Sequence, residues 1–110
     1  MLTELRLLLI EDSRTDAALL VRVLQQTGYR VTWQRIESEA ALLVALQSEL
    51  WDVVICDFVL PSFTCEKALR LIRTFHPMLP FIIVSGIIRE DEVMPLIELG
   101  AADFISKDRL

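Results

Sequence analysis

The stretch that decides the fold is Trp51-Asp52-Val53-Val54-Ile55-Cys56-Asp57-Phe58-Val59-Leu60-Pro61. Its run from Val53 to Cys56 is short, apolar and rich in β-branched residues, which is typical of a parallel strand buried on both faces. The run ends in the carboxylate of Asp57, and Pro61 then interrupts regular structure. Ligands of open α/β sheets bind at the carboxyl ends of central strands, so Asp57 is a candidate site residue. An ordinary loop or helix-capping aspartate is the competing interpretation.

Further strands and helices alternate on both sides of this strand. We expect strands at Leu5 to Ile10, Tyr29 to Ile36, Phe81 to Val84 and Asp103 to Ser106, and helices from Ser13 to Gly28, after Ser38, at Glu66 to Phe75 and within Asp91 to Leu99. Pro95 should make the last helix start late or bend in its first turn. The alternation predicts an α/β fold, a doubly wound parallel five-stranded sheet with helices on both faces.

Composition narrows the classes of function. The 110 residues suffice for one core, so we expect residues 1–110 to form a single domain. Mean hydropathy is +0.48, but no apolar run approaches the ~20 residues of a membrane span. Without a secretory signal, we expect a cytoplasmic protein that binds no membrane.

The net charge of −5 argues against nucleic-acid binding by this domain. The two cysteines are interpreted as reduced, small apolar residues.

Polar side chains follow four of the five predicted strands. Glu11 and Asp12 follow the first strand, Asp57 the third, Ser85 the fourth and Lys107 the fifth. Parallel strands end at one edge of a sheet, so these side chains should converge there. Three carboxylates in one place repel one another unless a cation intervenes, and oxygen ligands suit Mg²⁺. With Lys107 and Ser85 to receive a phosphoryl group, the pattern predicts phosphoryl transfer to Asp57 as an aspartyl phosphate.

Together these features resemble the receiver domain of bacterial response regulators, the CheY-like fold. The resemblance rests on Glu11-Asp12, on Asp57 with Leu60-Pro61, on Ser85-Gly86, and on Gly100-Ala101-Ala102-Asp103-Phe104 leading to Lys107. It implies the sheet order 2-1-3-4-5 and a role in two-component signalling. A sensor histidine kinase or phosphotransfer protein would donate the phosphoryl group. The native protein is expected to be either a stand-alone relay or one module of a longer chain with a fused kinase, PAS or output domain.

The resemblance also implies roles for individual residues. Asp12, Asp57 and the backbone carbonyl of Val59 would hold Mg²⁺, with Glu11 acting mostly through water. Ser85 and Phe104 would form a switch that alters the face of the fourth helix and fifth strand.

The protein is expected to be a phosphoacceptor rather than an enzyme, with at most slow self-dephosphorylation. The side chains of Val59 and Ile87 flank the expected pocket and are apolar, so they cannot orient a hydrolytic water.

The chain departs from the family pattern in several places. Asp108 follows the lysine where many receivers have proline, Cys65 stands where glycine is common, and the switch aromatic is Phe104 rather than tyrosine. The family's fifth helix is not among these residues. We therefore expect an open apolar face, with contributors among Leu7, Leu9, Val54 and Ile105, and self-association such as a homodimer.

Three other functions compete with this interpretation. A flavodoxin-like nucleotide binder would carry Gly, Ser and Thr in its first loop, but this loop carries Glu11, Asp12 and Asp16. An aspartate-based phosphatase would usually have a second acid two residues after the first, where this chain has Val59. A pseudo-receiver that only binds other proteins remains the main alternative.

Overall fold

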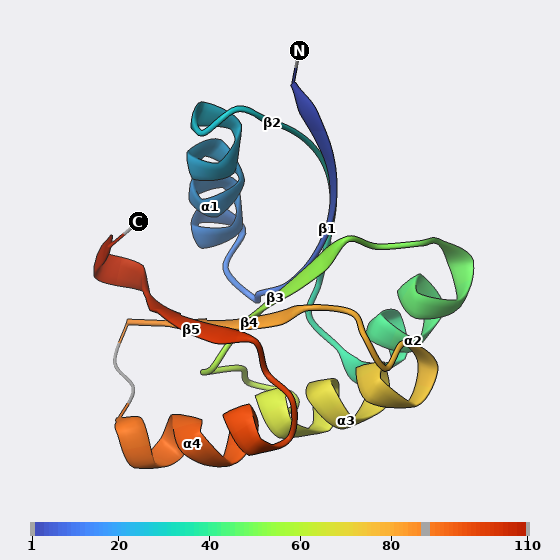
Figure 1. The fold of residues 1–110 in the computed structure, drawn as a ribbon, viewed down its shortest axis with the longest axis vertical. Coiled ribbons are helices and arrows are strands. Elements are labelled where there is room, and N and C mark those ends of the chain that lie inside the picture. The colour runs from blue at the N-terminus through green and yellow to red at the C-terminus, as the bar shows by residue number, and fades with distance from the viewer. Residues whose placement is uncertain (1, 87–88, 110) are drawn as a thin grey trace.

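The strands and helices alternate along the chain as predicted. The computed structural model describes residues 2–86 and 89–109. In chain order the elements are β1 (Thr3–Ile10), α1 (Arg14–Gln26), β2 (Tyr29–Ile36), α2 (Glu39–Ser48), β3 (Val53–Asp57), α3 (Cys65–Phe75), β4 (Phe81–Ser85), α4 (Glu90–Glu98) and β5 (Asp103–Ser106), followed by a 3₁₀ turn at Lys107–Arg109. All strand pairs are parallel, and the order β2-β1-β3-β4-β5 confirms the predicted fold class (Figure 1).

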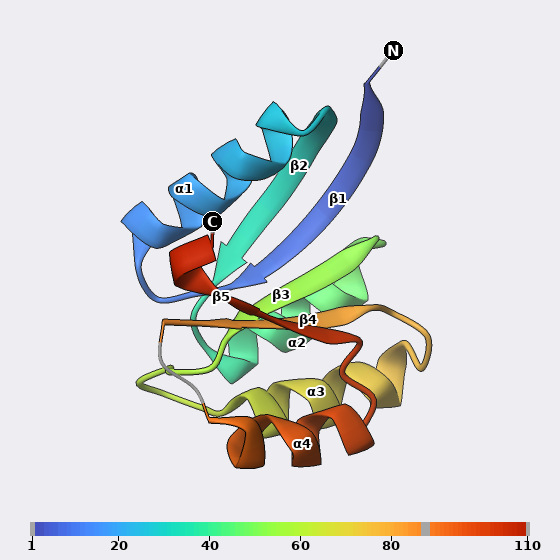
Figure 2. The same ribbon diagram turned by 60° about the vertical axis from the view of Figure 1, so that its left-hand side comes forward.

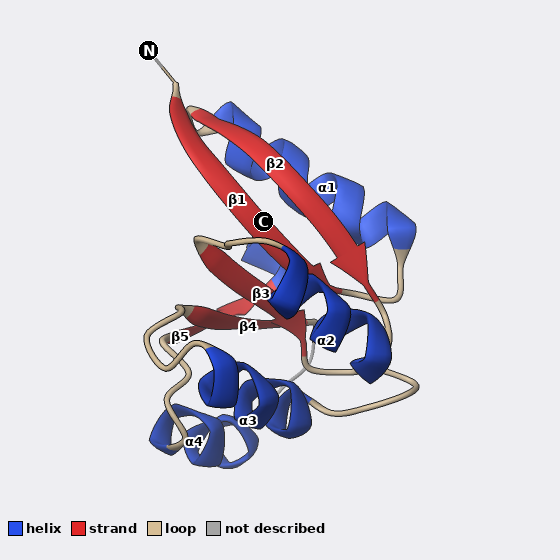
Figure 3. Cartoon of the chain, turned by 90° about the vertical axis from the view of Figure 1, so that its right-hand side faces the viewer, coloured by secondary structure: helices blue, strands red, loops and turns tan. Residues whose placement is uncertain are grey.

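Helices cover the sheet on both faces. Helix α1 lies on one side, and α2, α3 and α4 lie on the other (Figures 2 and 3). Successive side chains of a strand point to opposite faces, so β1 contributes to two cores. Leu7 and Leu9 pack with α1, whereas Leu8 and Ile10 pack in the larger cluster on the opposite face. The described part of the chain contains no helix long and apolar enough to cross a membrane.

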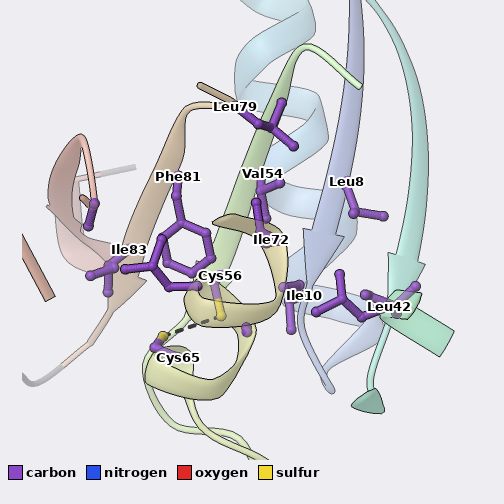
Figure 4. Close-up of a cluster of buried hydrophobic side chains, with 14 of the residues drawn as sticks. Leu8, Ile10, Leu42, Val54, Cys56, Cys65, Ile72, Leu79, Phe81 and Ile83 are labelled. Atoms are coloured by element: carbon purple, nitrogen blue, oxygen red, sulfur yellow. Dashed lines mark hydrogen bonds between the residues drawn. The ribbon is translucent and has the colours of Figure 1, made fainter. Parts of the chain in front are cut away.

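The larger core lies beneath α2 and α3. Figure 4 shows Ile72 of α3 among Val54, Phe81 and other strand residues, all of them fully buried. The interpretation of the cysteines as core residues is confirmed, because Cys56 and Cys65 are free and buried. Their sulfur atoms lie 3.3 Å apart in the same cluster.

The prediction of an open apolar face was wrong for three of the four residues named for it, because these three are buried. Val54 belongs to the larger core, because it shares the face of its neighbour Leu8 in β1. Leu7 and Leu9 are covered by α1, with exposed fractions of 0% and 2%. Only Ile105 is partly exposed. The expected homodimer therefore loses most of the surface from which it was argued and stays a prediction.

Two helix starts differ from the prediction. Helix α3 begins at Cys65, one residue early, because the Thr64 side chain accepts a hydrogen bond from the Lys67 N–H and caps the helix there. Helix α4 begins at Glu90, well before Pro95, so the late start was wrong. Pro95 lies beyond the first turn, where its ring does not determine the first helical residue.

Arg73 of α3 joins two loops at the edge of the sheet opposite the carboxyl ends of the strands. Its guanidinium donates hydrogen bonds to the carbonyl oxygens of Leu79 at 2.6 Å, Gly100 at 2.8 Å and His76 at 3.3 Å. Gly100 has φ +111°, and a Cβ there would lie 3.1 Å from the Arg73 Nε. The planar fork of an arginine suits several fixed acceptors at once, so Arg73 fixes the end of α4 relative to α3.

Replacing Arg73 should therefore destabilise the domain. Arg73→Ala leaves three carbonyl oxygens without this donor, and we expect a loss of about 2 kcal/mol in the free energy of unfolding. Arg70→Ala is the control, because Arg70 makes one exposed ion pair with Glu66, worth less than about 0.5 kcal/mol. Urea unfolding followed by circular dichroism measures both. Equal losses for the two variants would contradict this role of Arg73.

Candidate functional site

The register of the sheet aligns the predicted site residues at one edge. Ile10 of β1 lies opposite Cys56 of β3, so the residues that follow, Glu11 and Asp57, emerge side by side. On the other side of β3, Asp57 lies opposite Val84. The convergence inferred from the strand ends thus follows from the parallel pairing itself.

Three carboxylates meet at this edge. Oxygen atoms of Glu11, Asp12 and Asp57 all lie within 4.8 Å of one another, which suits a shared metal ion. Glu11 and Asp57 are buried, whereas Asp12 is exposed. Burial, with the nearby Asp57 carboxylate, raises the pKa of Glu11 above its usual range. Among the described buried side-chain oxygens and nitrogens, Glu11 Oε2 is the one without a hydrogen-bond partner. These residues fit a hard cation such as Mg²⁺.

Lys107 reaches back from the end of β5 into this acidic cluster. Its Nζ lies 3.0 Å from Glu11 Oε1 and 3.0 Å from Asp57 Oδ2. A third carboxylate, that of Asp16 in the first turn of α1, lies 2.8 Å away. Burial lowers the pKa of Lys107, but the hydrogen bonds to the three carboxylates outweigh it and raise the pKa overall. Lys107 is therefore a permanent positive charge at the site.

Asp16 is a site residue that the sequence reasoning missed. Its spacing from Ser13 indicated a capping box, and the Asp16 N–H does donate to the Ser13 Oγ at 3.2 Å. The Asp16 side chain, however, contacts Lys107 instead of turning back to the cap. The hydrogen bond from Lys107 lowers the pKa of Asp16. An acidic residue in the first turn of a helix that starts at this edge was the available signal.

The other predicted residues differ in burial and in what they contact. Ser85 is buried at the end of β4, and Phe104 packs partly buried against the larger core. Val59 is 66% exposed, and its N–H donates to Asp57 Oδ1 at 3.2 Å. Ile87 lies outside the described residues. Cys65 occupies the position where the family often has glycine. Its side chain is buried, and its sulfur lies 3.2 Å from the Asp57 carbonyl oxygen.

A pocket of about 190 Å³ opens beside Asp57 and Lys107. The apolar part of its wall comes from the sheet and from α1, through Leu9, Leu20, Ile55 and Val84. The site is therefore polar where its charges face one another and apolar toward α1.

The carboxyl-terminal edge of the sheet, with its acidic cluster and Lys107, is called the charged edge below. The fold and the charged edge together define a receiver-type signalling domain. The model of the family described as response regulator receiver domain matches residues 7–109, and the chain belongs to this family. Receiver domains act in two-component signalling with histidine kinases, as phosphoacceptors rather than as turnover enzymes.

Curated relatives cover most of the chain but are often longer. The transcriptional regulatory protein CreB of Escherichia coli is 33% identical over 90% of this chain and 42% of its own length. The protein CcdB of Bacillus subtilis is 31% identical over 93% of this chain and 84% of its own length. The chain spans only 22% of the transcriptional regulatory protein ZraR of Klebsiella oxytoca.

Solved structures share the fold. A putative response regulator from Chloroflexus aurantiacus is 28% identical, with a TM-score of 0.80 over 96% of this chain and 87% of its own. The Mn²⁺-bound response regulator Rcp1 has a TM-score of 0.80 at 23% identity, over 96% of this chain and 83% of its own. The receiver domain of the Pseudomonas aeruginosa sensor histidine kinase PA1611, with magnesium in its active-site cleft, has a TM-score of 0.76 at 21% identity, over 96% and 86%.

Removing one carboxylate of the cluster should weaken metal binding. We expect Asp12→Asn to lower the affinity for Mg²⁺ at least about tenfold, as loss of a metal-site residue commonly does. Isothermal titration calorimetry with MgCl₂ measures the affinity. Asp91→Asn removes the same charge from an exposed residue at the start of α4 and should bind Mg²⁺ like the wild type. An unchanged affinity for Asp12→Asn would contradict its assignment as a ligand.

Proposed function

We propose that this domain accepts a phosphoryl group on Asp57 from the phosphohistidine of a sensor kinase or phosphotransfer protein. The contact between Asp57 Oδ2 and Lys107 Nζ, at 3.0 Å inside the acidic cluster, is the observation that carries this proposal. An anionic nucleophile beside a fixed cation is the arrangement that transfer of a charged phosphoryl group needs.

The chemistry is a displacement at phosphorus. An Asp57 carboxylate oxygen forms the new P–O bond, the P–N bond to the donor imidazole breaks, and its electron pair returns to the ring nitrogen. Lys107 offsets the charge of the phosphoryl oxygens, and the Ser85 hydroxyl donates a hydrogen bond to one of them. Glu11, Asp12, Asp57 and the backbone carbonyl of Val59 would hold Mg²⁺. When bound, the ion supplies charge neutralisation between the carboxylates and the phosphoryl group.

The output of the site is a change in the face formed by α4 and β5. Ser85 ends β4, and Ser106 of β5 is its partner in the register. A Ser85 side chain drawn toward a phosphoryl group on Asp57 would change packing near Phe104 of β5, which is partly buried against the larger core. A fused output domain or a separate partner would read this face.

Loss of the acceptor should abolish labelling. Asp57→Asn keeps the size of the side chain but replaces the nucleophilic oxygen pair by a neutral amide. Incubation with acetyl phosphate and Mg²⁺, followed by intact-mass measurement, should add one phosphoryl group to the wild type and none to the variant. A folded wild type that gains no mass would favour the pseudo-receiver, and a variant labelled at the wild-type rate would exclude Asp57 as the acceptor.

The aspartyl phosphate should be long-lived for a receiver domain. Val59 is exposed beside the acceptor and has no polar group that could orient a water behind the phosphorus. Val59→Asn supplies one, and we expect hydrolysis to become about tenfold faster, which is less than the effect of a general base because an amide orients the water without taking its proton. The decay of the phosphorylated mass over time measures the rate, with Val59→Leu as the apolar control. An equal decay of both variants would refute this explanation.

A further inference from the structure

The ammonium group of Lys107 has no donor left for a further acceptor. An ammonium carries three N–H donors and accepts no hydrogen bond. Its three partners are Glu11, Asp16 and Asp57, at 3.0, 2.8 and 3.0 Å. A phosphoryl group on Asp57 brings new anionic oxygens to the same ammonium. Phosphorylation also consumes the Asp57 carboxylate, so the ammonium must leave Asp57 Oδ2 and turn toward the phosphoryl oxygens, and each remaining contact that holds it in place opposes this movement.

Exposure decides which contact is lost most easily. Of the two other acids, Glu11 has a side chain only 4% exposed, whereas that of Asp16 is 46% exposed. A buried polar group that loses its hydrogen-bond partner is not compensated by water. A half-exposed carboxylate is solvated by water instead, so its ion pair is weak and readily exchanged.

We infer that Asp16 is a positioning residue that competes with the phosphoryl group for Lys107. It holds the ammonium in the unphosphorylated domain and releases it when Asp57 is phosphorylated; this inference rests on the proposed function. The Asp16 backbone is fixed by the bond from its N–H to Ser13 Oγ, so the carboxylate is presented from a defined place in α1. Asp16 is not one of the three acids that could share a metal ion. Its effect is therefore separable from metal binding.

The consequence is that Asp16 restrains phosphorylation. Asp16→Asn keeps the side-chain shape and weakens the hold on Lys107. We expect the rate of labelling by acetyl phosphate to rise about threefold, the size expected for a half-exposed ion pair. The affinity for beryllium trifluoride, a phosphoryl mimic followed by ¹⁹F NMR, should rise by a similar factor. Asp16→Glu keeps a carboxylate within reach of the ammonium and should restore wild-type behaviour.

Two comparisons separate this role from a general change in charge or fold. Asp91→Asn removes the same charge from the first turn of α4, where Asp91 pairs with Arg89, and should leave both quantities unchanged. In a Lys107→Ala background, labelled over longer times, Asp16→Asn should have no further effect, because its action passes through the ammonium. Asp16→Ser provides a second neutral replacement, and thermal melts verify that each variant is folded.

The outcomes distinguish the inference from the proposed function. Faster labelling of Asp16→Asn that disappears without Lys107, with an unchanged calorimetric affinity for Mg²⁺, supports the competition. Labelling at or below the wild-type rate for both neutral variants overturns it, as does a gain that persists in the Lys107→Ala background. In those cases a labelled wild type still supports Asp57 as the acceptor. A wild type that neither gains a phosphoryl group nor binds beryllium trifluoride removes the proposed function and this inference together.

Discussion

The candidate site depends on one electrostatic feature. A single ammonium faces several carboxylates at the edge of a buried sheet. Lys107 contacts Glu11, Asp16 and Asp57, and within the described residues it is the one cation within ion-pair distance of these acids. Asp12 adds a further carboxylate to the cluster. One ammonium cannot neutralise all of these acids, and burial, which raises the pKa of Glu11, makes the imbalance more costly. The edge is therefore electrostatically incomplete without a cation, and it is suited to exchange one anionic partner for another.

The sheet brings these charged groups together because the register of its central strands fixes the positions of the strand ends. The apolar residues of β1 and β3 are held between α1 on one face and α2 and α3 on the other. A shift of one residue in register would turn these side chains to the wrong core. The packing of the two cores thus fixes the positions of Glu11 and Asp57 along the strand direction. The hydrophobic effect, rather than any attraction between the acids, supplies the energy that brings like charges together.

The sequence predicted the parts of the site that follow from strand order, and failed where a side chain had to choose a direction. Glu11, Asp57, Ser85 and Lys107 converge because parallel strands end together, which an alternating pattern already indicates. The face of Val54 was misassigned because an unbroken apolar run has no alternation to mark its two sides. Asp16 was missed for a related reason. Its contact with Lys107 joins residues 91 positions apart, and helix spacing alone does not reveal such a partner.

The face proposed as the output of the site includes helix α4. Helix α4 is fastened at its C-terminal end, where Arg73 binds the Gly100 carbonyl and the Ala102 N–H donates to the Phe81 carbonyl at 2.8 Å. At its N-terminal end, Arg89 donates hydrogen bonds to Asp91 and Glu92 of the same helix. Any change in the proposed α4 and β5 face therefore has to accommodate a C-terminal end of α4 that is tied to α3 and to the first residue of β4.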